Sequence, residues 1–123
     1  MPYTAYKLMH YVGMFTMITV LAAMGMHFLR GGSRADLPHR RALSIVHGVA
    51  VALILTGGFG MLARLGIVQG GLPTWIYLKL AIWLALAAAI AVPFYGARSA
   101  RALLVALPML AAAAGATAIY KPF

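Results

Sequence analysis

Four ionisable side chains lie close to the ends of long apolar segments or within them. Lys7 and His10 belong to the stretch YTAYKLMHYVG. Arg64 closes a second apolar segment, and Lys79 lies inside WIYLKLAIW. Ionisable groups at membrane depth are costly, so they usually face the interior of a helix bundle and mark function. We therefore treat these four residues as the first candidates for chemistry.

The residue types that the sequence lacks restrict this chemistry. It contains no cysteine and a single acidic residue, Asp36, which argues against thiolate metal sites, paired-carboxylate hydrolysis and a serine triad. A neutral imidazole in an apolar four-helix environment is instead a good axial ligand for haem iron. Basic side chains at the same level would pair with porphyrin propionates. His10 is thus the candidate iron ligand, and Lys79 and Arg64 are candidate propionate partners.

Three further side chains are candidates at other depths. His27 and His47 are possible metal ligands, and they could approach each other near the opposite face of the membrane. His10 and His27 are separated by roughly 25 Å along a helix, so they cannot bind one metal ion together. Trp83 lies deeper than Lys79 and is a candidate to stack on a flat cofactor.

Each of these residues also has a purely structural interpretation. Lys7 and Arg64 could snorkel to the membrane interface. His27 and His47 could lie at the interface or form hydrogen bonds with the backbone, and Trp83 could be a packing residue. Lys79 is the hardest to explain in this way, because it lies one turn inside an apolar segment.

The composition determines the class of protein that holds these residues. Of 123 residues, 64% are hydrophobic and 9% are charged, which leaves too few polar side chains to cover a soluble globule. The net charge of +9 does not indicate nucleic-acid binding, because the basic residues lie at the ends of apolar stretches. We expect one integral membrane domain, residues 1–123, in contact with the lipid bilayer and without a removable signal peptide.

Four stretches are long and apolar enough to cross a bilayer, at about residues 5–29, 43–65, 74–95 and 100–120. Glycine, proline and arginine residues separate them. Loops this short force neighbouring helices to run antiparallel. The predicted fold is therefore all-α, an up-down bundle of four transmembrane helices.

The distribution of lysine and arginine predicts how the bundle is oriented. Loop 30–41 carries four arginines and loop 95–101 carries two, against four basic residues on the other side. By the positive-inside rule, these two loops are cytoplasmic and both chain termini are outside. Lys7, His10, Arg64 and Lys79 then share one level in the outer leaflet.

Four stretches of the sequence resemble one family. YTAYKLMHYVGMF at the start, HRRALSIVHGVAVALILTGGFGML in the second span, WIYLKLAIWLAL in the third and the terminal YKPF are similar to the HemJ-type protoporphyrinogen IX oxidases. These are small bacterial membrane proteins in a wider group with the CopD-like and SirB-like proteins. The resemblance implies an inner-membrane protein that binds haem b and oxidises protoporphyrinogen IX.

The resemblance also implies roles for individual residues. The histidine and lysine regarded as essential in the family correspond to His10 and Lys79. His10 would be the axial ligand, and Lys79 would anchor a propionate or carry a proton in catalysis. Electrons would pass to a quinone or a respiratory partner. Where the family commonly has Asn-Glu before the last proline, this chain has Ala106 and Leu107, which favours haem binding over the oxidase activity.

Two other functions stay open from the sequence. Small residues in the last span would suit an accessory subunit that packs in a larger membrane complex, or a homo-oligomer. Methionine and histidine as soft ligands would suit a metal-handling transporter of the CopD-like type.

Overall fold

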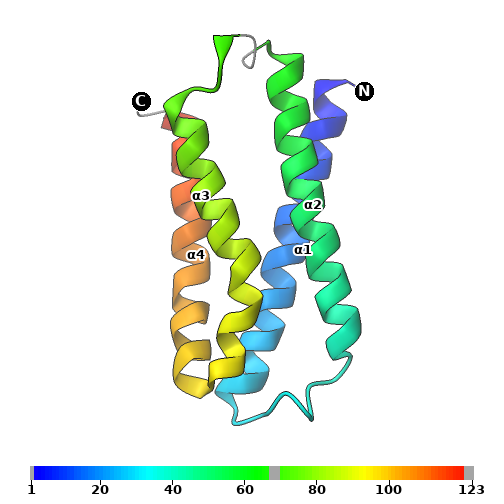
Figure 1. Ribbon diagram of the computed structural model, residues 1–123, viewed down its shortest axis with the longest axis vertical. Helices are drawn as coiled ribbons and strands as arrows, with labels where there is room; N and C mark the ends of the chain where they lie inside the picture. Colours follow the sequence, from blue (N-terminus) through cyan, green and yellow to red (C-terminus); the bar gives the residue numbers. More distant parts are fainter. Residues whose placement is uncertain (1, 67–69, 121–123) are drawn as a thin grey trace.

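The computed structural model describes residues 2–66 and 70–120, and in these residues it is a bundle of helices without strands. Four helices lie side by side and antiparallel, with both chain termini at one end (Figure 1). Their bounds are α1 Tyr3–Leu29, α2 Arg40–Arg64, α3 Thr74–Ala88 and α4 Ala97–Tyr120, and the 3₁₀ helix η2, Ala89–Tyr95, continues α3. All four spans are long and apolar enough to cross a membrane, which confirms the predicted fold class.

The ends of the helices follow from local sequence. Gly31 has a φ of +88°, and the N–H groups of Gly31 and Gly32 donate to the carbonyls of Phe28 and His27 at 3.1 and 3.0 Å. This pair of bonds is a Schellman motif, for which glycine is the preferred residue. α1 therefore stops at Leu29 because Gly31 adopts a backbone conformation that other residues rarely adopt.

The third span covers Thr74–Tyr95 as predicted, but it is not α-helical throughout. It changes from α to 3₁₀ at Ala89, four residues before the buried Pro93. In an α-helix, the proline ring would clash with the carbonyl of the residue four positions earlier and would lack the N–H to bond it. The 3₁₀ pattern of bonds between residues three apart avoids this contact, whereas α4 stays α-helical through Pro108.

The helices pack unevenly around the bundle. α1 and α2 share the most extensive interface, whereas α2 and α3 make few contacts. A Cβ atom on Gly13 would lie 2.8 Å from the carbonyl oxygen of Ala50, and one on Gly57 would lie 2.6 Å from the backbone nitrogen of His10. These two glycines therefore allow the backbones of α1 and α2 to approach closely.

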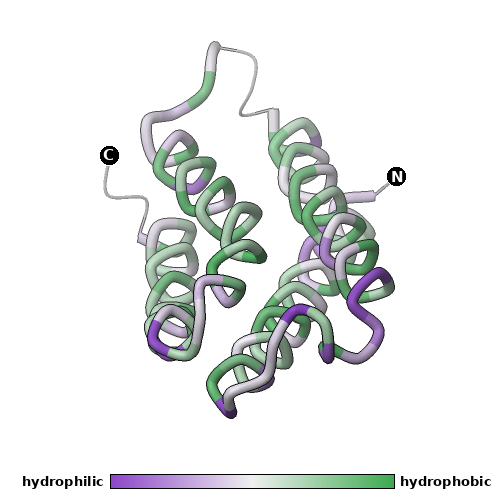
Figure 2. The backbone as a smooth tube through the Cα atoms, turned by 60° about the horizontal axis from the view of Figure 1, so that its bottom comes forward, coloured by the Kyte–Doolittle hydropathy of each residue, from purple (hydrophilic) through white to green (hydrophobic). Residues whose placement is uncertain are grey.

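The two ends of the bundle differ in charge. One end, here called the arginine end, holds the loop between α1 and α2 and the start of α4, where hydrophilic segments interrupt the apolar tube (Figure 2). Its six arginines, all exposed, are Arg30, Arg34, Arg40, Arg41, Arg98 and Arg101. The other end, here called the termini end, holds the start of α1, the end of α2, the start of α3 and the end of α4.

Candidate functional site

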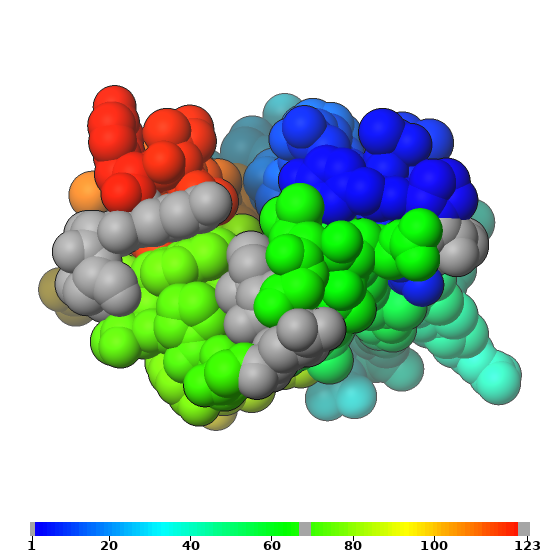
Figure 3. Space-filling view, turned by 90° about the horizontal axis from the view of Figure 1, so that it is seen from above, coloured from blue at the N-terminus to red at the C-terminus, as the bar shows by residue number. Residues whose placement is uncertain are grey.

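A cavity of about 210 Å³ opens between the helices at the termini end. Seen from that end, α1 and α2 lie on one side and α3 and α4 on the other (Figure 3). The lining is apolar and aromatic except for His10 from α1, Lys79 from α3 and the hydroxyl group of Tyr3 from α1. The cavity therefore occupies the region where α2 and α3 make few contacts.

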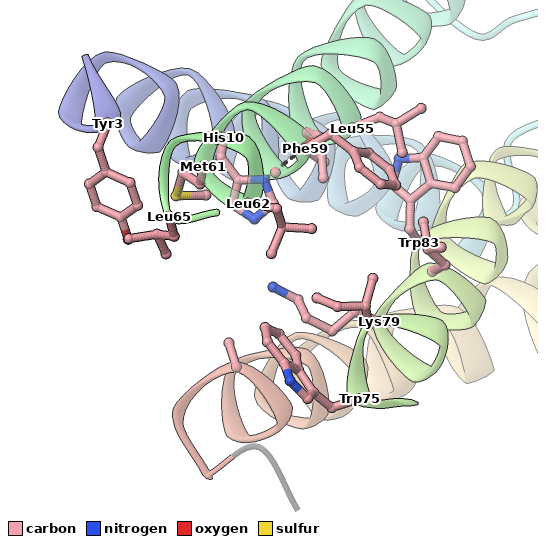
Figure 4. Close-up of a pocket in the computed structure, with 15 residues that line it drawn as sticks. Tyr3, His10, Leu55, Phe59, Met61, Leu62, Leu65, Trp75, Lys79 and Trp83 are labelled. Atoms are coloured by element: carbon pink, nitrogen blue, oxygen red, sulfur yellow. Dashed lines mark hydrogen bonds between the residues drawn. The ribbon is translucent and has the colours of Figure 1, made fainter. Parts of the chain in front are cut away.

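His10 is held in the wall of this cavity by a hydrogen bond to α2. Its Nδ1 lies 2.8 Å from the carbonyl oxygen of Ile54. Because a carbonyl oxygen can only accept, Nδ1 carries the proton and donates it. In the neutral imidazole, Nε2 then presents a lone pair, and Figure 4 shows this second nitrogen directed into the cavity. A histidine that donates one N–H to a backbone carbonyl is oriented in the way that metal-binding histidines usually are.

Gly57 of α2 lets α1 approach closely enough for the imidazole to reach this carbonyl. A Cβ atom on Gly57 would also lie 2.7 Å from the carbonyl oxygen of Tyr6, so any side chain there would push α1 away. At Gly58, a Cβ atom would be 3.5 Å from Nδ1 and Cε1 of the His10 ring, which is ordinary contact. The TGGFG segment of α2 is therefore shaped to receive α1 and the ring of His10.

Lys79 reaches into the cavity from the opposite wall. It is half-buried on α3, and its amine points across the cavity toward the imidazole of His10 (Figure 4). Lys79 forms no hydrogen bond or ion pair with any residue in the described part of the chain. A desolvated ammonium group without a counter-ion is suited to an anionic group of a ligand.

Aromatic rings of α3 line the cavity on either side of Lys79. Trp75, Lys79 and Trp83 are spaced by four residues, so they lie on one face of the helix, and all three line the cavity. The indole N–H of Trp83 donates to the carbonyl of Val51 on α2 at 3.2 Å. This contact fixes the ring at the deep end of the cavity. Trp75 was not among the candidates from the sequence, although its four-residue spacing from Lys79 was a usable signal.

The other basic residues of the termini end lie outside the cavity. Arg64 is exposed at the end of α2 and does not line the cavity. Lys7 is also exposed, and its Nζ lies 5.8 Å from the ring centroid of Tyr11 on the same helix. Of the four residues first singled out, the structure thus brings His10 and Lys79 together and leaves Lys7 and Arg64 at the surface.

His27 and His47 each have a separate hydrogen-bond partner, and neither residue lines this cavity. Nε2 of His27 lies 2.9 Å from both the carbonyl oxygen of Ser33 and Oδ1 of Asp36, at the arginine end. Nε2 of His47 donates to the carbonyl of Ala87, in the last turn of α3, at 3.0 Å. Both histidines thus form the backbone hydrogen bonds that the structural interpretation expected. No interaction joins them, and the described residues contain no group of three or more metal-ligating side chains.

Comparison with protein-family models, curated proteins and solved structures found no match to this chain. The similarity to the HemJ-type oxidases therefore stays a prediction from the sequence motifs.

Proposed function

We propose that the protein is a multi-pass membrane protein that binds haem b at the cavity of the termini end, with Nε2 of His10 as an axial ligand. The supporting observation is the hydrogen bond from Nδ1 of His10 to Ile54, which leaves the opposite ring nitrogen directed into an apolar cavity. Haem supplies one-electron redox chemistry when bound. The residues of the chain orient the imidazole, exclude water and place a positive charge nearby.

The donor set of the cavity fits this cofactor. His10 offers a neutral nitrogen, Lys79 offers an ammonium for a propionate, and Trp75 and Trp83 offer faces on which a flat ring can stack. Arg64 takes no such role in the proposal, because it lies outside the cavity. The sequence motifs extend the proposal to a HemJ-type oxidase in a bacterial inner membrane, with the termini outside and a quinone or respiratory partner accepting electrons.

The size of the cavity adds a condition to this proposal. A cavity of roughly 150 Å³ binds one benzene molecule, so about 210 Å³ has room for one substituted ring, and the rest of a porphyrin would extend through the open side of the cavity. α2 and α3 make few contacts beside the cavity. A porphyrin held wholly inside the cavity would require these two helices to move apart.

A second candidate follows from the same volume. A lipid-soluble quinone has one headgroup ring, whose carbonyl oxygen could accept a hydrogen bond from the ammonium of Lys79. The volume of the cavity is of the size of one such ring. In this case His10 would be a second polar contact to the headgroup and not a metal ligand.

An absorption spectrum of the detergent-purified protein separates the two candidates. Haem binding predicts a Soret band that is lost in His10→Ala and retained in His47→Ala, because only His10 faces the cavity. The sequence contains two tryptophans, and both line the cavity, so intrinsic fluorescence reports its occupancy. A colourless protein that does not bind added haem, but whose fluorescence is quenched by a short-chain quinone, would replace the first candidate by the second.

Complementation tests the finer assignment. A bacterial strain that lacks protoporphyrinogen oxidase should grow when it expresses the wild-type chain, and should fail to grow with Lys79→Met if the lysine acts in catalysis. Haem binding without complementation would limit the function to a haem-containing electron-transfer protein or subunit.

A further inference from the structure

The arginine end carries a large positive charge that the protein does not neutralise. The sequence has one acidic residue, Asp36, and its carboxylate accepts hydrogen bonds from the N–H of Ser33 at 2.6 Å and from Nε2 of His27 at 2.9 Å. These donors hold the pKa of Asp36 below its usual range. No ion pair joins this carboxylate to an arginine in the described residues. Among the described residues, the six guanidinium groups therefore have no carboxylate as a counter-ion.

A groove of about 450 Å³ runs along the last turns of α1 at this end. Its lining consists of Ala23, Met26, His27, Arg30, Gly32 and Pro38. Ala23 and Met26 are apolar and exposed on the last turns of α1, where they face lipid if the helix spans the membrane. The groove thus passes from an apolar wall to a basic rim over a short distance.

Arg30 lies at the boundary between these two parts of the groove. It is the first residue after α1, and the Schellman motif of Gly31 and Gly32 fixes the backbone that follows it. Its guanidinium forms no hydrogen bond or ion pair with the described residues. By contrast, the guanidinium carbon of Arg34 lies 5.4 Å from the ring centroid of Phe94 and is partly engaged there.

We propose that this groove binds an anionic phospholipid, with the phosphate on the guanidinium of Arg30 and an acyl chain along Ala23 and Met26. Guanidinium groups bind phosphate oxygens in a two-pronged geometry, and basic residues at the membrane surface attract anionic lipids. The five other arginines favour a headgroup with net negative charge over a zwitterionic one. The proposal does not involve the cavity at the termini end, so the two can be tested separately.

Native mass spectrometry of the purified protein tests this proposal with defined lipids. The protein is incubated with dioleoyl phosphatidylglycerol or with dioleoyl phosphatidylcholine, which have the same acyl chains. We expect phosphatidylglycerol to be retained at least about fivefold better than phosphatidylcholine, since one basic residue at a membrane surface contributes a factor of this size. Arg30→Gln should lose most of this preference. Arg64→Gln, which removes an exposed arginine at the other end, is the matched control and should keep it.

A second variant keeps the proposal testable if Arg30→Gln folds poorly. Ala23→Leu fills the apolar wall and leaves every arginine in place, so it should also reduce phosphatidylglycerol retention. Equal retention of the two lipids, or equal losses in Arg30→Gln and Arg64→Gln, would overturn the proposal. Displacement of the lipid by millimolar inorganic phosphate would instead identify a free-anion site, and a dimer lost in Arg30→Gln would identify a second copy of the chain as the occupant.

Discussion

The two buried histidines of α1 and α2, His10 and His47, each use one ring nitrogen for a hydrogen bond to a backbone carbonyl. They differ in the surroundings of the other ring nitrogen. His10 and His47 are 7% and 4% exposed, and each donates one ring N–H to a backbone carbonyl of a neighbouring helix. The other nitrogen of His10 faces a cavity. The other nitrogen of His47, Nδ1, is buried and has no hydrogen-bond partner in the described residues. A hydrogen bond to a carbonyl therefore orients a histidine but does not by itself make it a ligand.

The surroundings of the two rings explain this difference. His10 lies at the termini end, where α2 and α3 diverge and the cavity opens. His47 lies where two hydrogen bonds join α2 and α3. Its own Nε2 donates to Ala87 in the last turn of α3, and the indole N–H of Trp83 donates to Val51 of α2. The bundle is thus open around one histidine and closed around the other. His10 is therefore the candidate ligand because there is open space beside its unprotonated nitrogen, and the burial of the ring does not distinguish it from His47.

The largest expected difference between the two histidines is in haem binding. Removal of the imidazole in His10→Ala should lower haem affinity by at least about a hundredfold, because loss of an outer-shell partner alone costs 10–100-fold. Added free imidazole should restore the Soret band by occupying the vacated position. His47→Ala should bind haem normally and show no response to imidazole. A response to imidazole in His47→Ala alone would reverse the assignment of the two rings.

The glycines of α1 and α2 provide the next largest effect. Gly57→Ala should lower the free energy of unfolding by about 1–3 kcal/mol, because the added methyl group collides with the backbone of α1. It should also weaken ligand binding by moving His10. Gly48→Ala is the matched control on the same helix, since a Cβ atom there has no neighbour within 4 Å. Chemical unfolding in detergent measures both variants, and equal stability of the two would contradict the close approach of α1 and α2.

A smaller effect is expected when His47 is made apolar. His47→Leu removes the bond to Ala87 but also removes the unpartnered Nδ1. These two changes have opposite signs, so the free energy of unfolding should change by less than about 1 kcal/mol. The same unfolding assay tests this prediction. A loss of several times this size would show that Nδ1 has a partner in solution, such as a buried water molecule.

The smallest effect concerns the pH dependence of the loop at the arginine end. The hydrogen bond from the N–H of Ser33 lowers the pKa of Asp36, with a further contribution from His27. A carboxyl group whose folded pKa is depressed stabilises the folded loop at pH values above its unfolded pKa, and this stabilisation is lost as the pH falls through the folded pKa. We therefore expect the loop contact to persist from neutral pH to below pH 3.8, the usual value.

The single acidic residue makes this titration simple to follow. Carbon-13 labelling of aspartate gives one carboxyl resonance, whose midpoint should lie below the usual value. Ser33→Pro removes the N–H donor and should raise the midpoint. A midpoint at or above the usual value in the wild-type protein would mean that the hydrogen bonds of Asp36 are absent in solution.

The sequence predicted well at which level of the bundle a residue lies, but it predicted poorly in which direction its side chain points. Hydropathy placed all four spans, because about twenty apolar residues in a row are needed to cross a bilayer. It also placed His10 and Lys79 at one level. It did not predict that Arg64 would lie outside the cavity, because the direction of a side chain depends on how the helices are rotated against one another.

The sequence also could not reveal which backbone groups the histidines bind. The partners of His10 and His47 are carbonyls of Ile54 and Ala87, and every residue has a carbonyl, so no residue type marks these positions. The change to a 3₁₀ helix before Pro93 could have been anticipated from the proline. The pairing of His27 with Asp36 could also have been considered, because Asp36 is the only carboxylate available.

The 3₁₀ helix that ends the third span has a consequence for the fit between the protein and its membrane. The 15 residues of α3 reach about 22 Å at the rise of an α-helix. The seven residues of η2 add about 14 Å, because a 3₁₀ helix rises further per residue. α3 alone would be shorter than the hydrocarbon thickness of about 30 Å, whereas the combined span exceeds it. As one continuous α-helix, the 22 residues of this span would already reach about 33 Å. The 3₁₀ geometry of η2 therefore adds only about 3 Å and brings the shortest of the four spans to about the length of the 24-residue α4.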